Sequence, residues 1–117
     1  MNLKVDTTYD SFRYSIPLPN RAKANIFITE LEGSPHTITY NIGKTGSSES
    51  AWCNALARMT TFALQNTSLD EVIGELSDIA TDRYVELDDK TICRSGPEAL
   101  AIALRYYRDM KLLGDKR

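Results

Sequence analysis

The N-terminal part of the chain alternates between apolar and polar side chains with a period of two, which is typical of half-buried strands. Ile26 and Ile28, for example, fall on one face of the same extended segment. Gly33, Ser34 and Pro35 mark a turn between two such segments, because glycine and proline favour turns. The pattern predicts four strands, over residues 3–7, 12–16, 23–31 and 36–42.

From residue 46 onward, apolar side chains recur every three or four positions, as on one face of an amphipathic helix. The first predicted helix follows a turn at Gly46 and Ser47, where serine can accept hydrogen bonds from the first free N–H groups. It carries one apolar stripe that we expect to face the core: Trp52, Ala55, Leu56, Met59, Phe62 and Ala63.

A second helix is predicted to begin at Ser68. Ser68 and Glu71 have the spacing of a capping box, in which each side chain accepts a hydrogen bond from the other residue's backbone N–H. After this helix, segments 83–87 and 90–93 form a predicted short hairpin around Asp88 and Asp89. The expected buried stripe of the helix consists of Val72, Ile73, Leu76 and Ile79.

A third helix is predicted from Ser95 to Gly114. Ser95 and Glu98 again have capping-box spacing, and Pro97 stands in the first turn, where its missing N–H costs nothing. Its core-facing residues are expected to be Leu100, Ala103, Leu104 and Tyr107, with Ile102 and Tyr106 pointing elsewhere.

Strands therefore come first and helices afterwards. This order predicts an α+β fold with an N-terminal antiparallel β-sheet, two or three helices, and the short hairpin before the last helix. The 117 residues suit a single domain, 1–117, with mainly strands in 1–45 and mainly helices in 46–117. No apolar run reaches the roughly 20 residues of a membrane span, and the first residues lack a signal-peptide pattern. We therefore expect a cytoplasmic protein without a membrane partner.

The ionisable and sulfur-containing residues restrict the possible functions. With 14 basic and 16 acidic residues the net charge is −2, so a nucleic-acid polymer is not the expected partner. His36 is the only histidine and no C-x-x-C motif is present, so we expect neither a metal site nor a cofactor. Cys53 and Cys93 are either buried free thiols, which we favour, or one disulfide. No nucleophile–base arrangement is recognisable, so we do not expect an enzyme.

The start of the third predicted helix resembles the motif that names the TSCPD domain, Thr-Ser-Cys-Pro-Asp followed by an alanine-rich helix. Residues 94–98 read Arg-Ser-Gly-Pro-Glu, and Ala99, Ala101 and Ala103 follow. Residues 46–47, 55–59 and 69–73 are similar to the glycine-serine turn and the first two helices of the same domain. The resemblance covers about residues 41–107.

The TSCPD domain is similar to the C-terminal module of coenzyme-B12-dependent ribonucleotide reductases and also occurs in free-standing small proteins. In this chain Gly96 replaces the motif's cysteine, Arg94 its threonine and Glu98 its aspartate. The further cysteines of the reductase modules are missing as well. The resemblance therefore implies the scaffold of the domain without its thiol chemistry.

Free-standing proteins of similar length and element order include a phage anti-defence family that counters the Thoeris immune system. This resemblance implies a non-catalytic protein that sequesters a cyclic nucleotide or cyclic ADP-ribose-type immune signal in the host cytoplasm. It also implies an obligate homo-oligomer with interlocking C-terminal helices and a pocket lined by basic and aromatic side chains. There are two alternative functions: an accessory or regulatory module related to ribonucleotide reductase, or a pure protein-interaction module.

The third predicted helix carries the main candidates for such a pocket. Arg105 and Arg108 are three residues apart on one helical face and together can bind the oxygens of a pyrophosphate. Tyr106 or Tyr107 can stack on an adenine, although the same residues also suit a solvated face or a subunit contact. Ile102, Tyr106 and Leu113 exceed what one stripe can bury, so we expect at least a dimer held through this helix.

Further candidates lie on other segments, and each can bind an anion or simply be exposed. Arg83 and Tyr84 precede the hairpin within residues 66–90, where eight acidic and two basic residues give a net charge of −6. Arg21 precedes the long strand, and Arg58 lies beside the apolar stripe of the first helix. The candidate residues for a small cyclic nucleotide are therefore Arg105, Arg108, Tyr106, Arg83, Tyr84, Arg21 and Arg58.

Overall fold

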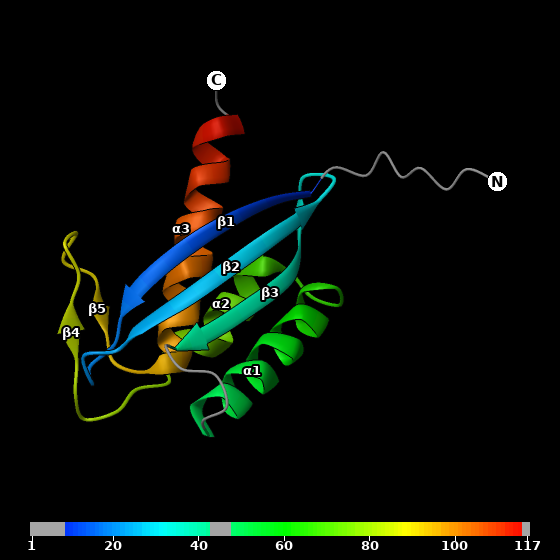
Figure 1. Cartoon of the computed structure of the whole chain (residues 1–117). Helices are drawn as coiled ribbons and strands as arrows, with labels where there is room; N and C mark the ends of the chain where they lie inside the picture. Colours follow the sequence, from blue (N-terminus) through cyan, green and yellow to red (C-terminus); the bar gives the residue numbers. More distant parts are fainter. Residues whose placement is uncertain (1–8, 43–47, 116–117) are drawn as a thin grey trace.

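The computed structural model describes residues 9–42 and 48–115 and has the predicted α+β architecture (Figure 1). The strand predicted at residues 3–7 and the turn at Gly46 and Ser47 lie outside the described residues. The other predicted elements are present, and the last helix continues one residue past Gly114. In order, the elements are β1 (Tyr9–Pro17), β2 (Lys23–Leu31), β3 (Ser34–Ile42), α1 (Ser48–Leu64), α2 (Leu69–Ser77), β4 (Val85–Glu86), β5 (Ile92–Cys93) and α3 (Gly96–Asp115).

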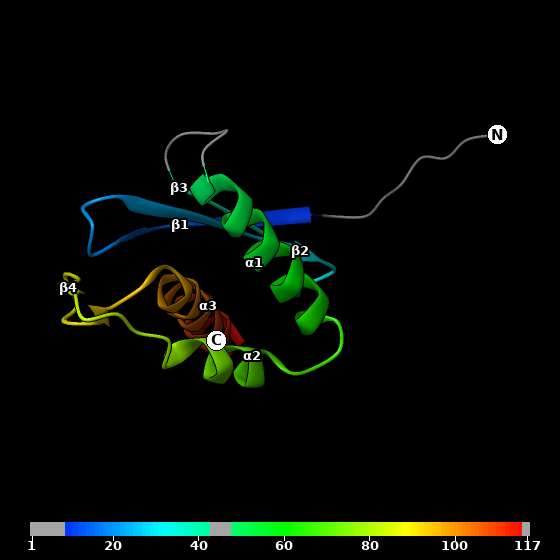
Figure 2. The ribbon, with the colours of Figure 1, turned by 90° about the horizontal axis from the view of Figure 1, so that it is seen from below.

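The first three strands form one antiparallel sheet in the order β1-β2-β3. Phe12 pairs with Ile28, which pairs in turn with Ile38, so one face of the sheet is apolar across all three strands. α3 lies on that side of the sheet with α2 on its far side, and α1 packs along the edge strand β3 (Figure 2). The sheet is therefore half-buried, as the alternating pattern predicts.

The N-terminal half of α3 lies between the sheet and α2, and residues 99–104 are all fully buried. The prediction that Ile102 points away from the core is wrong, because its side chain is 0% exposed. The hydrophobic periodicity of α3 was interpreted as one buried face, against the sheet. In the structure α2 covers a second face of this helix. Tyr106 is half-buried, with its ring 6.4 Å from that of Tyr14 on β1. Of the three residues that suggested a dimer through α3, only Leu113 is exposed.

A buried carboxylate holds the C-terminal half of α3 against β2. Glu30, which is 3% exposed, accepts a hydrogen bond from the Tyr107 hydroxyl at 2.5 Å. Its other partner is Lys111, whose Nζ lies 3.0 Å from the same carboxylate. Burial, followed by this hydrogen bond, raises the pKa of Tyr107 and keeps its hydroxyl a donor. These contacts hold α3 against the sheet.

α1 packs with a different face from the one predicted. Met59 and Phe62, expected in the core, are 65% and 62% exposed. The hydroxyl of Thr61 donates to the Ala57 carbonyl at 2.8 Å and accepts from the Ile38 N–H of edge strand β3 at 3.0 Å. These polar contacts with β3 set the rotation of α1 about its axis, and hydrophobic periodicity does not encode them. The side chains that α1 does bury are small: Cys53, Ala57 and Thr60.

α2 begins with the predicted capping box. The Ser68 hydroxyl accepts from the Glu71 N–H at 3.1 Å, and the Glu71 carboxylate accepts from the Ser68 N–H at 3.2 Å. The helix ends at Ser77, so Ile79 lies beyond it and is 43% exposed, contrary to the prediction. The buried stripe is limited to Val72, Ile73 and Leu76.

Cys53 and Cys93 are both buried and form no disulfide with each other, as expected. Among the described residues, no helix is long and apolar enough to cross a membrane.

Candidate ligand-binding cleft

The start of α3 is capped as the sequence predicts, and the cap also ties α3 to the end of α2. The Ser95 hydroxyl accepts from the Glu98 N–H at 3.1 Å and donates to the carbonyl of Ile79. The Glu98 carboxylate accepts from the N–H of Arg94 at 2.8 Å, one residue earlier than in a standard capping box. The motif segment therefore acts as a fixed junction between two helices.

Arg94 and Glu98 form the central ion pair of this junction. The Arg94 guanidinium donates from Nε and Nη2 to the two carboxylate oxygens, at 2.9 and 2.5 Å, and from Nη2 to the Ser77 carbonyl at 3.1 Å. Glu98 is 5% exposed, and the hydrogen bond from Arg94 lowers the pKa of its carboxyl group. The carboxylate is therefore fixed and ionised at neutral pH.

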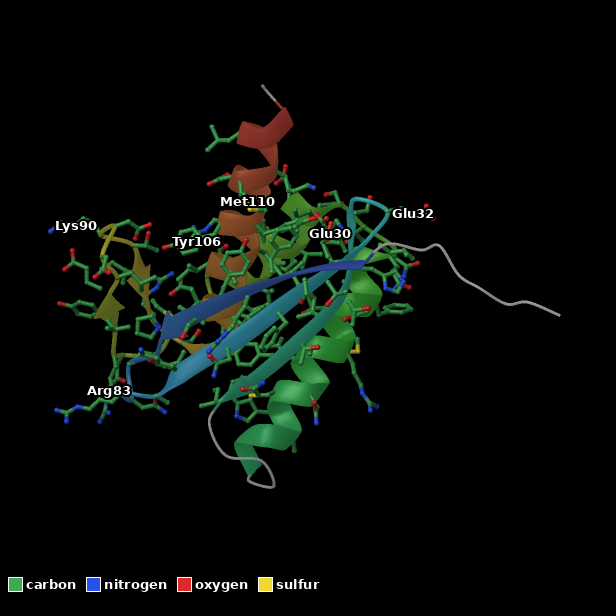
Figure 3. All side chains as sticks on the ribbon, turned by 45° about the horizontal axis from the view of Figure 1, so that its top comes forward. Glu30, Glu32, Arg83, Lys90, Tyr106 and Met110 are labelled. Carbon is green, nitrogen blue, oxygen red and sulfur yellow. The ribbon has the colours of Figure 1, made fainter. Side chains whose placement is uncertain are left out.

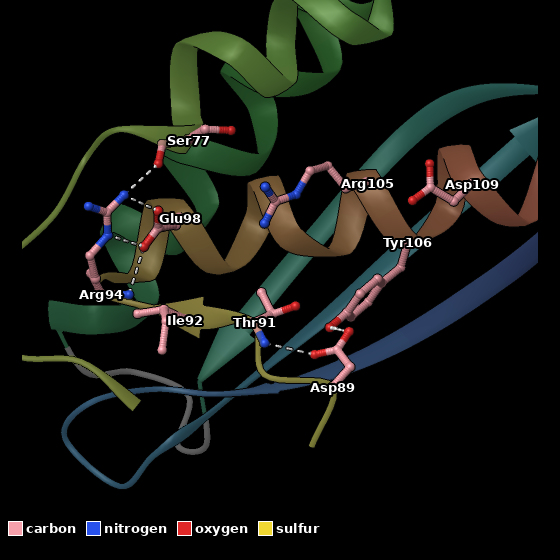
Figure 4. A pocket seen from close by; sticks show the side chains of 9 residues that line it. All are labelled: Ser77, Asp89, Thr91, Ile92, Arg94, Glu98, Arg105, Tyr106 and Asp109. Atoms are coloured by element: carbon pink, nitrogen blue, oxygen red, sulfur yellow. Dashed lines mark hydrogen bonds and ion pairs between the residues drawn. The ribbon is translucent and has the colours of Figure 1, made fainter. Parts of the chain in front are cut away.

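A cleft of about 760 Å³ opens beside this junction, between the end of α2, the β4–β5 hairpin and α3 (Figure 4). One wall is α3, along which Glu98, Arg105 and Asp109 follow one another. The opposite wall is the hairpin, whose Asp89 accepts a hydrogen bond from the Tyr106 hydroxyl at 2.8 Å. The lining residues are Ser77, Asp89, Thr91, Ile92, Arg94, Glu98, Arg105, Tyr106 and Asp109.

The three carboxylates of the cleft are all occupied by donors of this chain. Asp89 accepts from the Thr91 N–H at 3.1 Å as well as from Tyr106, and the hydrogen bonding to Thr91 is the largest cause of its lowered pKa. Asp109 accepts from Nε of Arg108 at 3.2 Å. Glu98 is bound by Arg94, so no carboxylate in the cleft is left without a donor.

Arg105 differs from these groups. Its half-buried side chain lines the cleft between Glu98 and Tyr106, yet it makes no hydrogen bond or ion pair with any residue that the structure describes (Figure 4). Arg94, the other cation of the cleft, is already paired with Glu98. The cleft therefore offers a permanent positive charge with five N–H donors available to an anion.

A second hollow of about 390 Å³ adjoins the cleft and shares Ile92 and Arg94 with it. Arg83 and Tyr84 line this second hollow, and Tyr84 is 68% exposed. In Figure 3, Arg83 lies at the outer edge of the molecule, whereas Tyr106 lies between α3 and the hairpin. Four of the seven predicted residues, Arg105, Tyr106, Arg83 and Tyr84, thus line two adjacent hollows.

The other three predicted residues lie elsewhere. Arg108 binds Asp70 of α2, with 2.9 Å between Nη1 and Oδ1, so Arg105 and Arg108 do not share the cleft. Arg21 is in the β1–β2 turn with a positive φ of 73°. Arg58 is exposed on α1. None of the three lines the cleft.

We expect Arg108→Ala to lower the free energy of unfolding by less than about 1 kcal/mol, because its ion pair with Asp70 is largely exposed. The same substitution is expected to leave ligand affinity unchanged. Denaturant unfolding and calorimetric titration of this variant check both statements. A large loss of affinity at normal stability would place Arg108 in the site after all.

Sequence reasoning missed Arg94, Glu98, Asp89 and Thr91 as parts of one site. Arg94 and Glu98 have the spacing of an i,i+4 ion pair, which is a local signal that was available. The approach of Asp89 to Tyr106 across 17 positions has no local signal. Within the described residues, no group of three or more histidine, cysteine, aspartate or glutamate side chains is placed to hold a metal.

Comparison with models of protein families matches residues 7–108 to the TSCPD domain. This covers most of the chain, so the protein belongs to the TSCPD family, and the match takes in the N-terminal sheet as well as the predicted 41–107 region. No curated protein and no solved structure matches the chain.

Gly96, which stands in place of cysteine in the resemblance to the family's motif, has little space for a side chain. Gly96 accepts a hydrogen bond on its carbonyl from the Tyr40 hydroxyl at 2.8 Å. A Cβ added to Gly96 would lie 2.5 Å from Cη2 of Trp52 and 3.3 Å from the Tyr40 hydroxyl. The indole ring therefore takes up the space that a side chain at this position requires.

Proposed function

We propose that this TSCPD protein is a non-catalytic binding protein that sequesters a small anionic nucleotide, such as a cyclic dinucleotide or a cyclic ADP-ribose-type immune signal, in the cleft beside α3. The observation that carries the proposal is the Arg105 guanidinium, which lines the cleft without a hydrogen bond or ion pair to any described residue, while the cleft's carboxylates are occupied. An arginine in this situation binds phosphate oxygens through two parallel N–H donors.

The rest of the cleft suits the other parts of a nucleotide. Ser77 and Thr91 also line it, and the Ser77 hydroxyl, which donates to the Ile73 carbonyl at 2.6 Å, can still accept a hydrogen bond from a ribose hydroxyl. Tyr84, exposed in the adjoining hollow, offers a ring face on which a base can stack, a contact worth about 1–3 kcal/mol per base. A ligand that crosses Ile92 would reach both hollows, since this residue lines each of them.

The state of the carboxylates supports binding without cleavage. A general acid or base works best with a pKa near the operating pH. Hydrogen bonding lowers the pKa of Glu98 and of Asp89, so both remain ionised and their oxygens are already taken by donors of the chain. These two groups are therefore poor proton-transfer groups, and the bound ligand is expected to be released intact.

Native mass spectrometry of the protein as purified from its expressing cells tests this proposal. We expect an added mass in the range of a cyclic nucleotide, which reappears unchanged in solution after denaturation. If the natural signal is missing from those cells, incubation with ADP-ribose and adenine-containing cyclic dinucleotides should produce the same complex. A protein that takes up none of these compounds would contradict the proposal, and a hydrolysed product would contradict its non-catalytic part.

A further inference from the structure

The outward face of α1 carries large apolar side chains that the chain's own core does not use. Met59 and Phe62 are 65% and 62% exposed. The buried face of the helix is made of smaller side chains instead, among them Cys53 and Ala57. An amphipathic helix that turns its largest apolar residues outward exposes a patch of the kind that marks a protein contact.

An apolar groove continues this patch toward α2. It has a volume of about 440 Å³, and Met59 lies at its edge. Its apolar lining on α1 is Leu56 and Ala63, and on α2 it is Val72 and Leu76. Phe62 follows Met59 by three residues and extends the patch along the helix. The patch with Met59 and Phe62 and the groove together form one continuous surface, which we call the α1–α2 face.

Charges of opposite sign border the two sides of the α1–α2 face. Glu71 and Glu75 of α2 line the groove. Arg58 lies on the other side of α1, because a helical position turns by about 100° per residue and Arg58 is turned from Met59 in the direction opposite to Leu56. Neither Arg58 nor Glu75 makes a hydrogen bond or ion pair with any residue in the described part of the chain.

We propose that the α1–α2 face binds a second copy of this chain, with the two α1 helices packed side by side and parallel about a two-fold axis that runs along them. Such an axis places the Arg58 side of each copy over the Glu75 side of the other, so both ion pairs form at once. If the two α1 helices were antiparallel, the Arg58 side of one copy would face the Arg58 side of the other, and the two Glu75 sides would also face each other. The α1–α2 face carries a positive side and a negative side, so two copies can pair them reciprocally. This is the isologous contact of a homodimer.

This dimer leaves the ligand-binding cleft accessible. The cleft lies between the end of α2, the hairpin and α3, whereas the α1–α2 face is formed by α1 and the groove-lining residues of α2. Figure 2 shows α1 on the other side of the helical layer from the β4–β5 hairpin. The proposed contact is therefore independent of nucleotide binding, and either one can hold without the other.

Sedimentation velocity over a range of protein concentrations tests the dimer. We expect an apparent mass of twice the 13.1 kDa of the chain for the wild type, and of 13.1 kDa for the Met59→Glu/Phe62→Glu variant. Leu112→Glu/Leu113→Glu is the matched control, since it changes exposed apolar residues at the end of α3 and should remain a dimer. A monomeric wild type, or a dimer disrupted by the control and not by the α1 variant, would overturn the proposal.

A charge exchange tests the parallel arrangement without removing apolar contacts. Arg58→Glu and Glu75→Arg are each expected to raise the dimer dissociation constant about tenfold, the change that about 1.4 kcal/mol produces. The double variant restores opposite charges across the interface and should return the constant toward the wild-type value. Additive weakening in the double variant would show that these residues do not face each other. Circular dichroism confirms that each variant is folded.

Discussion

Replacing Gly96 by cysteine, the residue that names the family motif, is expected to lower the free energy of unfolding by about 1–3 kcal/mol, the usual cost of overpacking. The added Cβ would lie 2.5 Å from Cη2 of Trp52, closer than such atoms can approach. Either the indole must move out of its place against α3 or the first turn of the helix must shift. A shift of that turn would also strain the hydrogen bond from Tyr40 to the Gly96 carbonyl.

Gly74→Cys is the matched control, because a Cβ added at Gly74 in α2 meets no atom of the described residues within 4 Å. It is expected to be neutral or stabilising, since glycine in a helix interior is less favourable than a residue with a side chain. Denaturant unfolding followed by circular dichroism compares the two variants. Equal stability of Gly96→Cys and wild type would mean that Trp52 does not close the family's cysteine position.

Glu98→Gln is expected to lower the free energy of unfolding at pH 7 by about 2 kcal/mol, in the range of hydrogen bonds to charged groups. The side chain of Glu98 is 6% exposed and accepts three hydrogen bonds from Arg94, so its charge is compensated within the protein. Glutamine keeps the shape and one acceptor oxygen but leaves the guanidinium without its counter-charge. The substitution therefore isolates the contribution of the charge.

The effect of Glu98→Gln is expected to depend on pH. Folding lowers the pKa of Glu98 below its ordinary 4.5, so its stabilising contribution is fully present above that value and is lost as the pH falls through the folded-state pKa. The wild type should therefore lose its advantage over the variant as the pH falls below 4.5. Glu32→Gln, at an exposed turn, is the control. A stability difference between wild type and Glu98→Gln that is the same at every pH would contradict this explanation.

Local signals predicted the elements of this fold well. The capping residues Ser68 and Ser95 mark the starts of α2 and α3, and the extent of β2 matches the predicted strand. These features depend on neighbours within four residues, which the sequence displays directly. The α+β class follows from the order of the elements alone, without knowledge of any tertiary contact.

The faces that pack against one another were harder to predict. Ile102 was expected to point away from the core and Met59 to be buried in it, and both predictions are wrong. Periodicity shows that a helix is amphipathic, but it does not show whether a second layer covers the other face, as α2 covers α3. Nor does it reveal a polar contact such as that of Thr61 with the Ile38 N–H, which sets the rotation of α1.

The same distinction applies to the cleft. Arg105 and Tyr106 stood out because cationic and aromatic residues are adjacent in the sequence, and they line the cleft. Arg108 stood out for the same reason, yet Asp70 of α2, 38 positions away, binds its guanidinium outside the cleft. Spacing along a helix therefore identified the charged residues, whereas their partners from other elements decide which of them is available to a ligand.

The central claim is that Arg105 binds the phosphate of a sequestered nucleotide, and isothermal titration calorimetry of Arg105→Ala tests it most directly. The wild type is titrated with ADP-ribose and adenine-containing cyclic nucleotides, and Arg21→Ala, which changes an exposed arginine outside the cleft, is the control. We predict that Arg105→Ala weakens binding by about 1.5–3 kcal/mol while Arg21→Ala binds as the wild type does. A wild type that binds none of these ligands would contradict the sequestration function, and an Arg105→Ala variant with wild-type affinity would contradict the location of the site.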